Sequence, residues 1–469
     1  MEEELTTLPE RFEKAASNTL INDLTTGSVS QKLIKFAIPF MLANLMQVLY
    51  NIVDMVVVGQ FVDSAGISAV ANGGDIINLV TIFCIGLSTA GQIVIAQLVG
   101  NKDTDGIKKA IGTLYSFMGL AAIAFTALSL LLVDWLILAV NVPPEAQAGA
   151  RAYCVVLFSG MVFIFGFNAV SAILRGMGDS KRPLIIITIA SVLNLILDLV
   201  LIKPMGIKGV AIATVTAQGL SFILSMIYLY IRRDAFGFDY KLKSFRIDGG
   251  MLRFLLRLGL PLGLLYSSVT ISKVFVNSWV NSYGVVLSAV TGIGTKIGQV
   301  ASIITSALGT AGSTMIAQSV GAGKISRVNR IIYVSWGWGL LYTAALSILF
   351  VLFPDQIFGL FSKDPEVLIQ AADYVIIAIL NFNAFALRIP MIALLEGTGN
   401  GKLAIIIGIV DGVVARIGLS LFMGLTLNMG IRGFWFGNVI ASFMPFVIGC
   451  FYYFTGAWKK HISTEGSTD

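Results

Sequence analysis

The chain has 469 residues, of which 56% are hydrophobic and only 12% are charged, and its formal net charge is +6 at pH 7. Soluble domains carry roughly 25% charged residues, so this composition excludes an ordinary soluble protein and indicates that lipid is the main solvent. The basic residues lie between apolar runs and not on one face, which argues against nucleic acid as a partner.

Apolar runs long enough to cross a bilayer fill most of the chain. A helix needs about 20 apolar residues for this, and the expected fold is an all-α integral membrane protein of about twelve spans. In chain order we expect spans near 33–58, 67–98, 108–138, 148–174, 183–202, 208–231, 252–280, 286–318, 328–353, 366–395, 403–427 and 432–456.

Residues that would indicate enzyme chemistry or a bound cofactor are scarce. Cys84, Cys154 and Cys450 lie in apolar segments without a CxxC pair, and we interpret them as packing residues. The only histidine, His461, lies in the polar tail, so we expect neither a histidine-ligated metal nor a cofactor. No nucleophile–base constellation or nucleotide-binding domain is visible, so transport would be driven by an ion gradient or would be passive.

The distribution of lysine and arginine predicts the orientation of the spans. One set of loops and tails carries 23 of these residues and the opposite set carries five. Cytoplasmic loops hold the excess of positive charge, so both termini are expected on the cytoplasmic side. The basic set comprises residues in 11–35, 102–109, 175–182, 232–257, 324–330, 402 and 459–460.

The two halves of the chain resemble each other. Residues 88–100 (STAGQIVIAQLVG) and 309–321 (GTAGSTMIAQSVG) share eight identical positions at an offset of 221. The same offset places 175–181 on 396–402 and Tyr153 on Tyr374, while Pro39 meets Pro261 at an offset of 222. Such regularity favours a true internal repeat over chance similarity of glycine-rich helices.

Six spans in each half would start on the same side, which predicts a parallel repeat of two six-helix bundles related by a pseudo-twofold axis along the membrane normal. This arrangement suits alternating access. The predicted organisation is a polar cytoplasmic segment (1–30), an N-lobe (31–231), a basic linker (232–251), a C-lobe (252–456) and a cytoplasmic tail (457–469).

Two acids inside predicted spans are candidates for function, because ionisable groups in a membrane are costly. Asp54 and Asp198 each lie about four residues before the outer end of an outward-running span, so at about 1.5 Å per residue they reach similar depth. Asn194 shares a helix face with Asp198, at i and i+4. Such a group can bind a small cation or share a proton, although both acids near the interface could simply be hydrated.

Gln47 and Tyr50 share a helix face with Asp54 and add an amide and a phenol to this candidate site. At the equivalent positions the second half has Val276 or Asn277 and Leu419, so the acidic pair belongs to the first half alone.

The second half carries Lys273, Lys296, Arg388, Asp411 and Arg416 in its predicted spans. Asp411 with Arg416 or Arg388 is more consistent with a buried structural pair than with substrate contact, whereas Lys273 and Lys296 have no assigned role.

Several blocks of the chain resemble the multidrug and toxic compound extrusion (MATE) family. They are Pro39 followed by LYNIVDMVVVGQ (49–60), LRGMGDSKRP (174–183), NLILDL (194–199) and GVAIAT (209–214), and the similarity covers roughly residues 30–455. The resemblance implies an antiporter of the plasma membrane of a bacterium or archaeon. It would export amphipathic, often cationic, small molecules in exchange for H⁺ or Na⁺ and act as a monomer.

Within the family the chain is more similar to the DNA-damage-inducible type than to the norfloxacin type, which has an acid where this chain has Lys273. The resemblance implies that Asp54, Asn194, Asp198 and Thr214 bind the cation, with Thr216 as an alternative to Thr214. Gln47, Tyr50 and Asn168 would line the substrate cavity. A flippase of lipid-linked intermediates shares this architecture and stays as the alternative.

Overall fold

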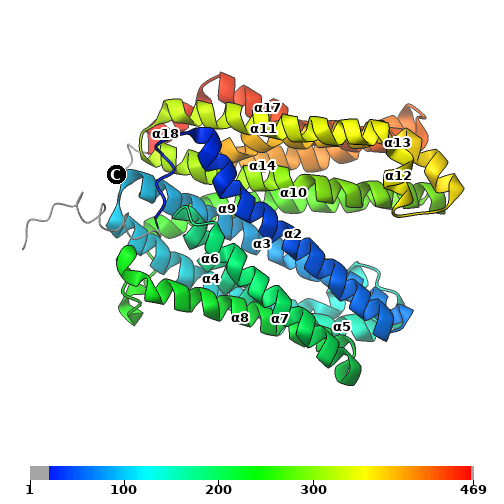
Figure 1. Cartoon of the computed structure of the whole chain (residues 1–469), viewed down its shortest axis with the longest axis horizontal. Helices are drawn as coiled ribbons and strands as arrows, with labels where there is room; N and C mark the ends of the chain where they lie inside the picture. The colour runs from blue at the N-terminus through cyan, green and yellow to red at the C-terminus, as the bar shows by residue number, and fades with distance from the viewer. Residues whose placement is uncertain (1–20, 466–469) are drawn as a thin grey trace, which may run out of the picture. The chain divides into compact units, whose positions relative to one another are not determined.

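Residues 21–465 of the computed structural model are described, except for the side chains at 50, 51, 461 and 463–465, and within this part every regular element is a helix (Figure 1). The helices form two compact units. Unit 1 comprises residues 21–24 with Ile38–Leu260, and unit 2 comprises Thr25–Ala37 with 261–465. Parts of the predicted terminal segments, 1–20 and 466–469, lie outside the described residues.

Unit 1 contains six long helices or helix pairs and a short connection to the second half. The division between the units falls inside two proline-containing helices, next to Pro39 in α2 and at Pro261 in α9. The elements are α2 (Val29–Phe61), α3 (Ser64–Asn101), α4 (Thr104–Ala139), α5 (Pro144–Ser159), α6 (Met161–Gly176), α7 (Lys181–Met205), α8 (Ile207–Ile231), η1 (Arg233–Ala235), η2 (Leu242–Ser244) and α9 (Gly249–Asn281).

Unit 2 continues from α9 with a similar series of long helices. One of its spans, 401–426, alternates between α-helical and wider π-helical turns. The elements are α10 (Val285–Gly321), α11 (Ile325–Leu352), α12 (Pro354–Gly359), α13 (Pro365–Gly397), α14 (Gly401–Ile407), η3 (Gly408–Ile417), α15 (Gly418–Leu421), η4 (Phe422–Thr426), α16 (Gly430–Ser442), α17 (Met444–Phe454) and α18 (Ala457–Glu465).

By length and composition, eleven helices of the described chain can cross a membrane, and the bent pair α5–α6 raises the number to twelve. This confirms the predicted all-α membrane fold. The single span expected at 148–174 is bent by 48° at Gly160. A Cβ on Gly160 would lie 2.5 Å from Cγ2 of Val215, so α8 packs against the bend at a distance that only glycine permits.

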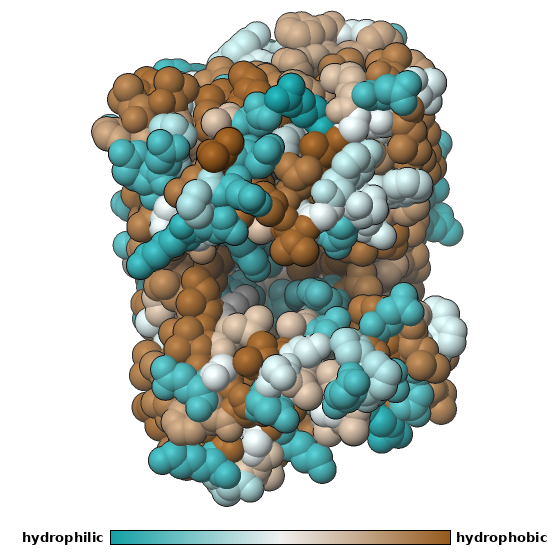
Figure 2. Space-filling view, turned by 90° about the vertical axis from the view of Figure 1, so that its right-hand side faces the viewer, coloured by the Kyte–Doolittle hydropathy of each residue, from teal (hydrophilic) through white to brown (hydrophobic). Residues whose placement is uncertain are grey.

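Large apolar side chains stay exposed along the sides of the helices. Leu131 is 82% exposed, and Ile123 and Leu341 are each 62% exposed. In Figure 2, which looks onto one end of the helices, hydrophilic residues gather over that end while hydrophobic residues dominate the flanks. Lipid contact accounts for such surfaces, because soluble monomers rarely expose contiguous apolar area of this extent.

The repeat seen in the sequence is reproduced by contacts within each unit. In unit 1 a Cβ on Gly73 would lie 2.7 Å from Cδ1 of Tyr153, and in unit 2 a Cβ on Gly294 would lie 2.0 Å from Cε1 of Tyr374. Both glycines and both tyrosines are separated by the offset of 221. The same pair of residue types therefore brings the same two helices together in each unit.

A second repeated contact lies near the end of α6 and of α13. A Cβ on Gly176 would approach Cβ of Ile95 to 2.9 Å, and a Cβ on Gly397 would approach Cγ2 of Ile316 to 2.6 Å. Small residues allow membrane helices to approach closely. These matched contacts support the internal repeat, with one six-span bundle per half.

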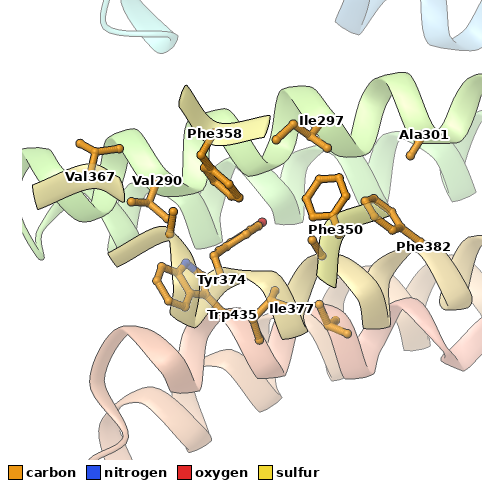
Figure 3. Close-up of a cluster of buried hydrophobic side chains, with 13 residues drawn as sticks. Val290, Ile297, Ala301, Phe350, Phe358, Val367, Tyr374, Ile377, Phe382 and Trp435 are labelled. Atoms are coloured by element: carbon orange, nitrogen blue, oxygen red, sulfur yellow. The ribbon is translucent and has the colours of Figure 1, made fainter. Parts of the chain in front are cut away.

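Aromatic side chains form the core of unit 2 (Figure 3). Tyr374 of α13 meets Trp435 of α16 edge to face, with ring centroids 5.1 Å apart, and Phe350 meets Phe382 at 5.0 Å. The indole nitrogen of Trp435 donates to Oγ1 of Thr291 at 2.9 Å, so the one polar atom of this ring is satisfied.

The connection between α8 and α9 packs onto α4. The Ser116 hydroxyl donates to the Phe245 carbonyl at 2.9 Å, and the ring of Tyr240 lies 4.8 Å from that of Phe238. Burial against these aromatic rings raises the pKa of Tyr240 to about 12. The basic linker predicted at 232–251 is thus tied to unit 1.

Candidate functional site

Helices α2 and α7 place the predicted acidic pair inside unit 1. Asp198 and Asn194 are fully buried on α7, and Asp54 on α2 is 9% exposed. The spacing i, i+4 puts Asn194 and Asp198 on one face of α7. The structure therefore brings together the three side chains that the sequence singled out.

Hydrogen bonds connect these three residues. With its amide NH₂ turned toward the carboxylates, Asn194 donates from Nδ2 to Oδ2 of Asp198 at 3.0 Å and to Oδ1 of Asp54 at 3.2 Å. One amide thus contacts a carboxylate oxygen of each acid, which places the two acids close enough for the charge of one to affect the other.

Helix α8 contributes the fourth predicted residue. The backbone N–H of Thr214 donates to Oδ1 of Asn194 at 3.2 Å, and the hydroxyl of Thr214 donates to the Val210 carbonyl at 3.1 Å. The alternative, Thr216, is exposed and bonds only within its own helix turn, to the Ile212 carbonyl. Of the two threonines, Thr214 is therefore the one at the acidic pair.

Two cavities of unit 1 lie beside this group and share the lining residues Gln47 and Thr214, whereas Asp198 lines neither. One measures about 30 Å³ and is lined by Gln47, Asn194 and Thr214, which is room for about one water molecule or a small cation. The other measures about 550 Å³ and is lined by Gln47, Asp54, Asn168 and Thr214. A pocket of that size accommodates a small organic molecule.

The predicted cavity residues Gln47 and Asn168 thus line the larger space, and the amide of Asn168 donates to the Ile164 carbonyl at 2.9 Å. The side chain of Tyr50 lies outside the described residues, although its backbone is part of α2.

Several lining residues were missed by the sequence reasoning. Gln218 lines both cavities and Asn44 lines the larger one. Helical spacing could have indicated them, because Gln218 follows Thr214 by one turn and Asn44 precedes Gln47 by one turn. Arg175 also lines the larger cavity and donates from Nε to Oε1 of Gln92 at 2.8 Å.

The group has the chemistry of a site for a small hard cation or a proton. The carboxylate oxygens of Asp54 and Asp198 are ligands of the kind that hard cations prefer. Among the described residues, Oδ1 of Asp198 has no hydrogen-bond partner although it is buried. Buried acceptors are normally satisfied, so this oxygen is available to a cation.

The ionisable residues of unit 2 separate into paired and unpaired groups. Arg416 forms a buried ion pair with Asp411 at 2.6 Å and also donates from Nη2 to Oγ of Ser442 at 3.2 Å. This confirms the interpretation of Asp411 and Arg416 as a buried pair. Arg388 lies over the ring of Phe385 at 4.8 Å. Within residues 21–465, no ion pair includes Lys273, Lys296 or Arg388.

Comparisons with known proteins agree with the fold and its repeat. The family model described as MatE matches twice, over residues 39–200 and 261–421, once in each half of the chain. The chain is 28% identical over 440 residues to "Probable multidrug resistance protein YoeA" of Bacillus subtilis (strain 168), covering 92% of this chain and 95% of that protein. It is 24% identical over 449 residues to "Probable multidrug resistance protein NorM" of Thermotoga maritima, covering 92% and 94% respectively.

Among solved structures, the chain is similar to a MOP superfamily transporter from Pyrococcus furiosus Vc1, for which a reverse polarity of the binding pocket is said to suggest a different function. The TM-score is 0.85 at 23% identity, covering 95% of this chain and 98% of that one. This similarity shows a shared fold. Because the family model covers most of the sequence in two matches, the chain belongs to the MatE family of membrane transporters.

Proposed function

We propose that this protein is a secondary active multidrug efflux antiporter, which exports amphipathic, often cationic compounds in exchange for H⁺ or Na⁺. The observation that carries the proposal is the convergence of Asp54, Asn194 and Asp198 beside a cavity of about 550 Å³. The relatives named as multidrug resistance proteins support the substrate class.

The acidic group would couple ion and substrate through its charge. Either a proton or Na⁺ reduces the negative charge of the two carboxylates, and the cost of burying them falls accordingly. Conformations that bury the group are then favoured when the ion is bound, which biases alternating access. For Na⁺, the Asn194 amide would turn so that its carbonyl oxygen faces the ion in place of its NH₂ group.

Coupling would take place in the N-lobe (31–231), as the resemblance to the DNA-damage-inducible type implies. Lys273 in the C-lobe (252–456) supports this assignment, because a lysine cannot replace an acid as a cation ligand. Arg416 is neutralised by Asp411, so it does not add to a cationic cavity for lipid pyrophosphates. Lys273 and Arg388 form no ion pair within residues 21–465, but the relatives are named multidrug resistance proteins, and for this reason we propose drug export rather than a flippase.

The protein would act as a monomer in the cytoplasmic membrane of a bacterium or archaeon, with both termini in the cytoplasm. The excess of lysine and arginine in one set of loops supports this orientation.

Proteoliposomes test the coupling directly. They would contain the purified protein and a fluorescent organic cation, and ΔpH and ΔNa⁺ would be imposed separately. We expect one of the two gradients to accelerate dye movement, with ion movement in the opposite direction. Dye movement that is independent of both gradients would contradict the proposal.

A further inference from the structure

A further acidic residue lies in a cavity of unit 2. Glu396, in the last turn of α13, is 7% exposed. The hydroxyl of Tyr266 on α9 donates to its Oε1 at 2.7 Å. A phenol of α9 therefore holds the carboxyl group of α13 in position.

Glu396 has neutral partners only. In the described part of the chain, no lysine or arginine forms an ion pair with it. Asp411, which lines the same cavity, is by contrast paired with Arg416 at 2.6 Å. An ionised carboxylate is costly to bury without a cation, so Glu396 is the acid of this cavity that can accept a cation from outside the protein.

The cavity beside Glu396 measures about 320 Å³. Its walls combine apolar side chains, such as Val269 and Ile392, with the hydroxyl groups of Thr270 and Thr310. Arg388 also lines the cavity, but it precedes Glu396 by eight residues on α13, or about 12 Å along the helix axis, so the two charges belong to different parts of the wall. Apolar walls with a few convergent polar groups are typical of small-molecule sites of this size.

The internal repeat shows that the fold does not require an acid at this position. Glu396 corresponds to Arg175 at the offset of 221, and Ser313 corresponds to Gln92. In unit 1 the Arg175 guanidinium donates to Gln92, whereas in unit 2 Glu396 accepts from Tyr266 and the Ser313 hydroxyl donates to the Thr310 carbonyl. Positions 175 and 396 therefore carry opposite charges although the helix contacts around them match. Because those contacts do not require a negative charge, we assign the charge of Glu396 to function.

We propose that the cavity between α9, α10 and α13 is a binding site for the cationic group of an amphipathic organic compound, with Glu396 as its counter-charge. The apolar walls would hold the hydrophobic part of the compound. The inference rests on the proposed export of cationic compounds, and it adds a recognition site in unit 2 that is separate from the coupling group in unit 1.

Equilibrium binding to the purified full-length protein tests this site. Ethidium is the cationic probe and N-phenyl-1-naphthylamine is a neutral amphipathic one, both followed by fluorescence. We expect Glu396→Gln to weaken ethidium binding about tenfold, as loss of one charge-assisted contact predicts, and to leave the neutral dye unaffected. Glu366→Gln, the same change at an exposed position of α13, serves as the control and should bind both dyes as the wild type does.

A second variant tests the same cavity without changing Glu396, so that a folding defect in Glu396→Gln cannot decide the result. Ser306 is exposed and lines the cavity, so Ser306→Phe fills the site without touching the carboxylate, and we expect it to weaken ethidium binding at least as much. Unchanged ethidium affinity in both variants would overturn the inference, as would equal loss for both dyes in Glu396→Gln. Different results would contradict the proposed function. They are a wild type that binds no organic cation, or efflux that does not depend on an ion gradient.

Discussion

Asn194 and Asp198 lie one turn apart on α7, and the Asn194 amide donates to Oδ2 of Asp198 at 3.0 Å. The same NH₂ group reaches Asp54 on α2, so one amide holds two carboxylates from different helices. The cation site proposed for unit 1 depends on this arrangement.

Replacing the amide should weaken coupling without unfolding the protein. Asn194→Leu keeps the side-chain size but removes both donors and the carbonyl ligand, so we expect gradient-driven dye efflux to fall at least tenfold, about 1.4 kcal/mol or more. The control is Asn72→Leu, whose amide bonds to the Ser68 carbonyl of its own helix. Equal efflux in the two variants would exclude a coupling role for Asn194.

The ion pair between Asp411 and Arg416 should stabilise unit 2 without taking part in transport. Removing one partner leaves a buried charge uncompensated, so Asp411→Ala should lower stability by about 3–5 kcal/mol. The double variant Asp411→Leu with Arg416→Met should recover much of this loss, because a buried pair can be replaced by apolar packing. Thermal unfolding in detergent measures both. A single variant as stable as the wild type would contradict the structural role.

The close helix contact at Gly397 predicts a steric effect. Gly397→Ala would place a Cβ 2.6 Å from Cγ2 of Ile316, and such overpacking typically costs about 1–3 kcal/mol. Gly337→Ala is the matched control, since no atom lies within 4 Å of its added Cβ. The control should be neutral or slightly stabilising in thermal unfolding. If Gly397→Ala unfolded at a higher temperature than Gly337→Ala, the contact at Gly397 would be looser than the structure indicates.

Asp179 lies outside the membrane-spanning segments, where its side chain accepts from the backbone N–H groups of Lys181 and Arg182 at the start of α7, and its effect on stability should depend on pH. Burial raises the pKa of the Asp179 carboxyl above its ordinary value, and Arg182 opposes the shift only in part. A carboxyl with a raised pKa favours the folded state while protonated, and this contribution is lost as pH rises through the folded pKa.

Asp179→Asn should therefore unfold at a higher temperature than the wild type at pH 7, with the difference shrinking toward acidic pH. The amide can still cap the helix, as its repeat counterpart Asn400 does by accepting from the Leu403 N–H at 3.1 Å. Asp179→Ala, which also removes the cap that accepts from Lys181, should be about 1 kcal/mol less stable than Asp179→Asn at any pH. A difference between Asp179→Asn and the wild type that does not vary with pH would contradict the assigned cause.

Features set by local spacing could be predicted from the sequence. The spans follow from runs of apolar residues, and the shared face of Asn194 and Asp198 follows from helical periodicity. The offset of 221 pairs Tyr153 with Tyr374, and the structure has both tyrosines in matching contacts with Gly73 and Gly294. Each of these depends on residues close in sequence or on direct comparison of two segments.

Features set by distant contacts could not be predicted. The bend at Gly160 depends on its approach to Val215 in α8. The sequence predicted a buried pair for Asp411 but left Arg388 and Arg416 open as its partner, and the π-helical turns of η3, which bring residues i and i+5 together, select Arg416. Glu396 was visible only as the counterpart of Arg175. Its cavity depends on three helices whose packing no local pattern encodes.

The two carboxylates of unit 1 provide the most direct test of the proposed coupling. In proteoliposomes, ion movement driven by an opposing gradient of organic cation would be measured for the wild type, Asp54→Asn and Asp198→Asn. Asp134→Asn, an exposed acid paired with Arg151, is the control. We predict that the wild type and control exchange the coupling ion for the dye and that both site variants lose this exchange while staying folded. Full exchange in Asp198→Asn would contradict the proposed mechanism.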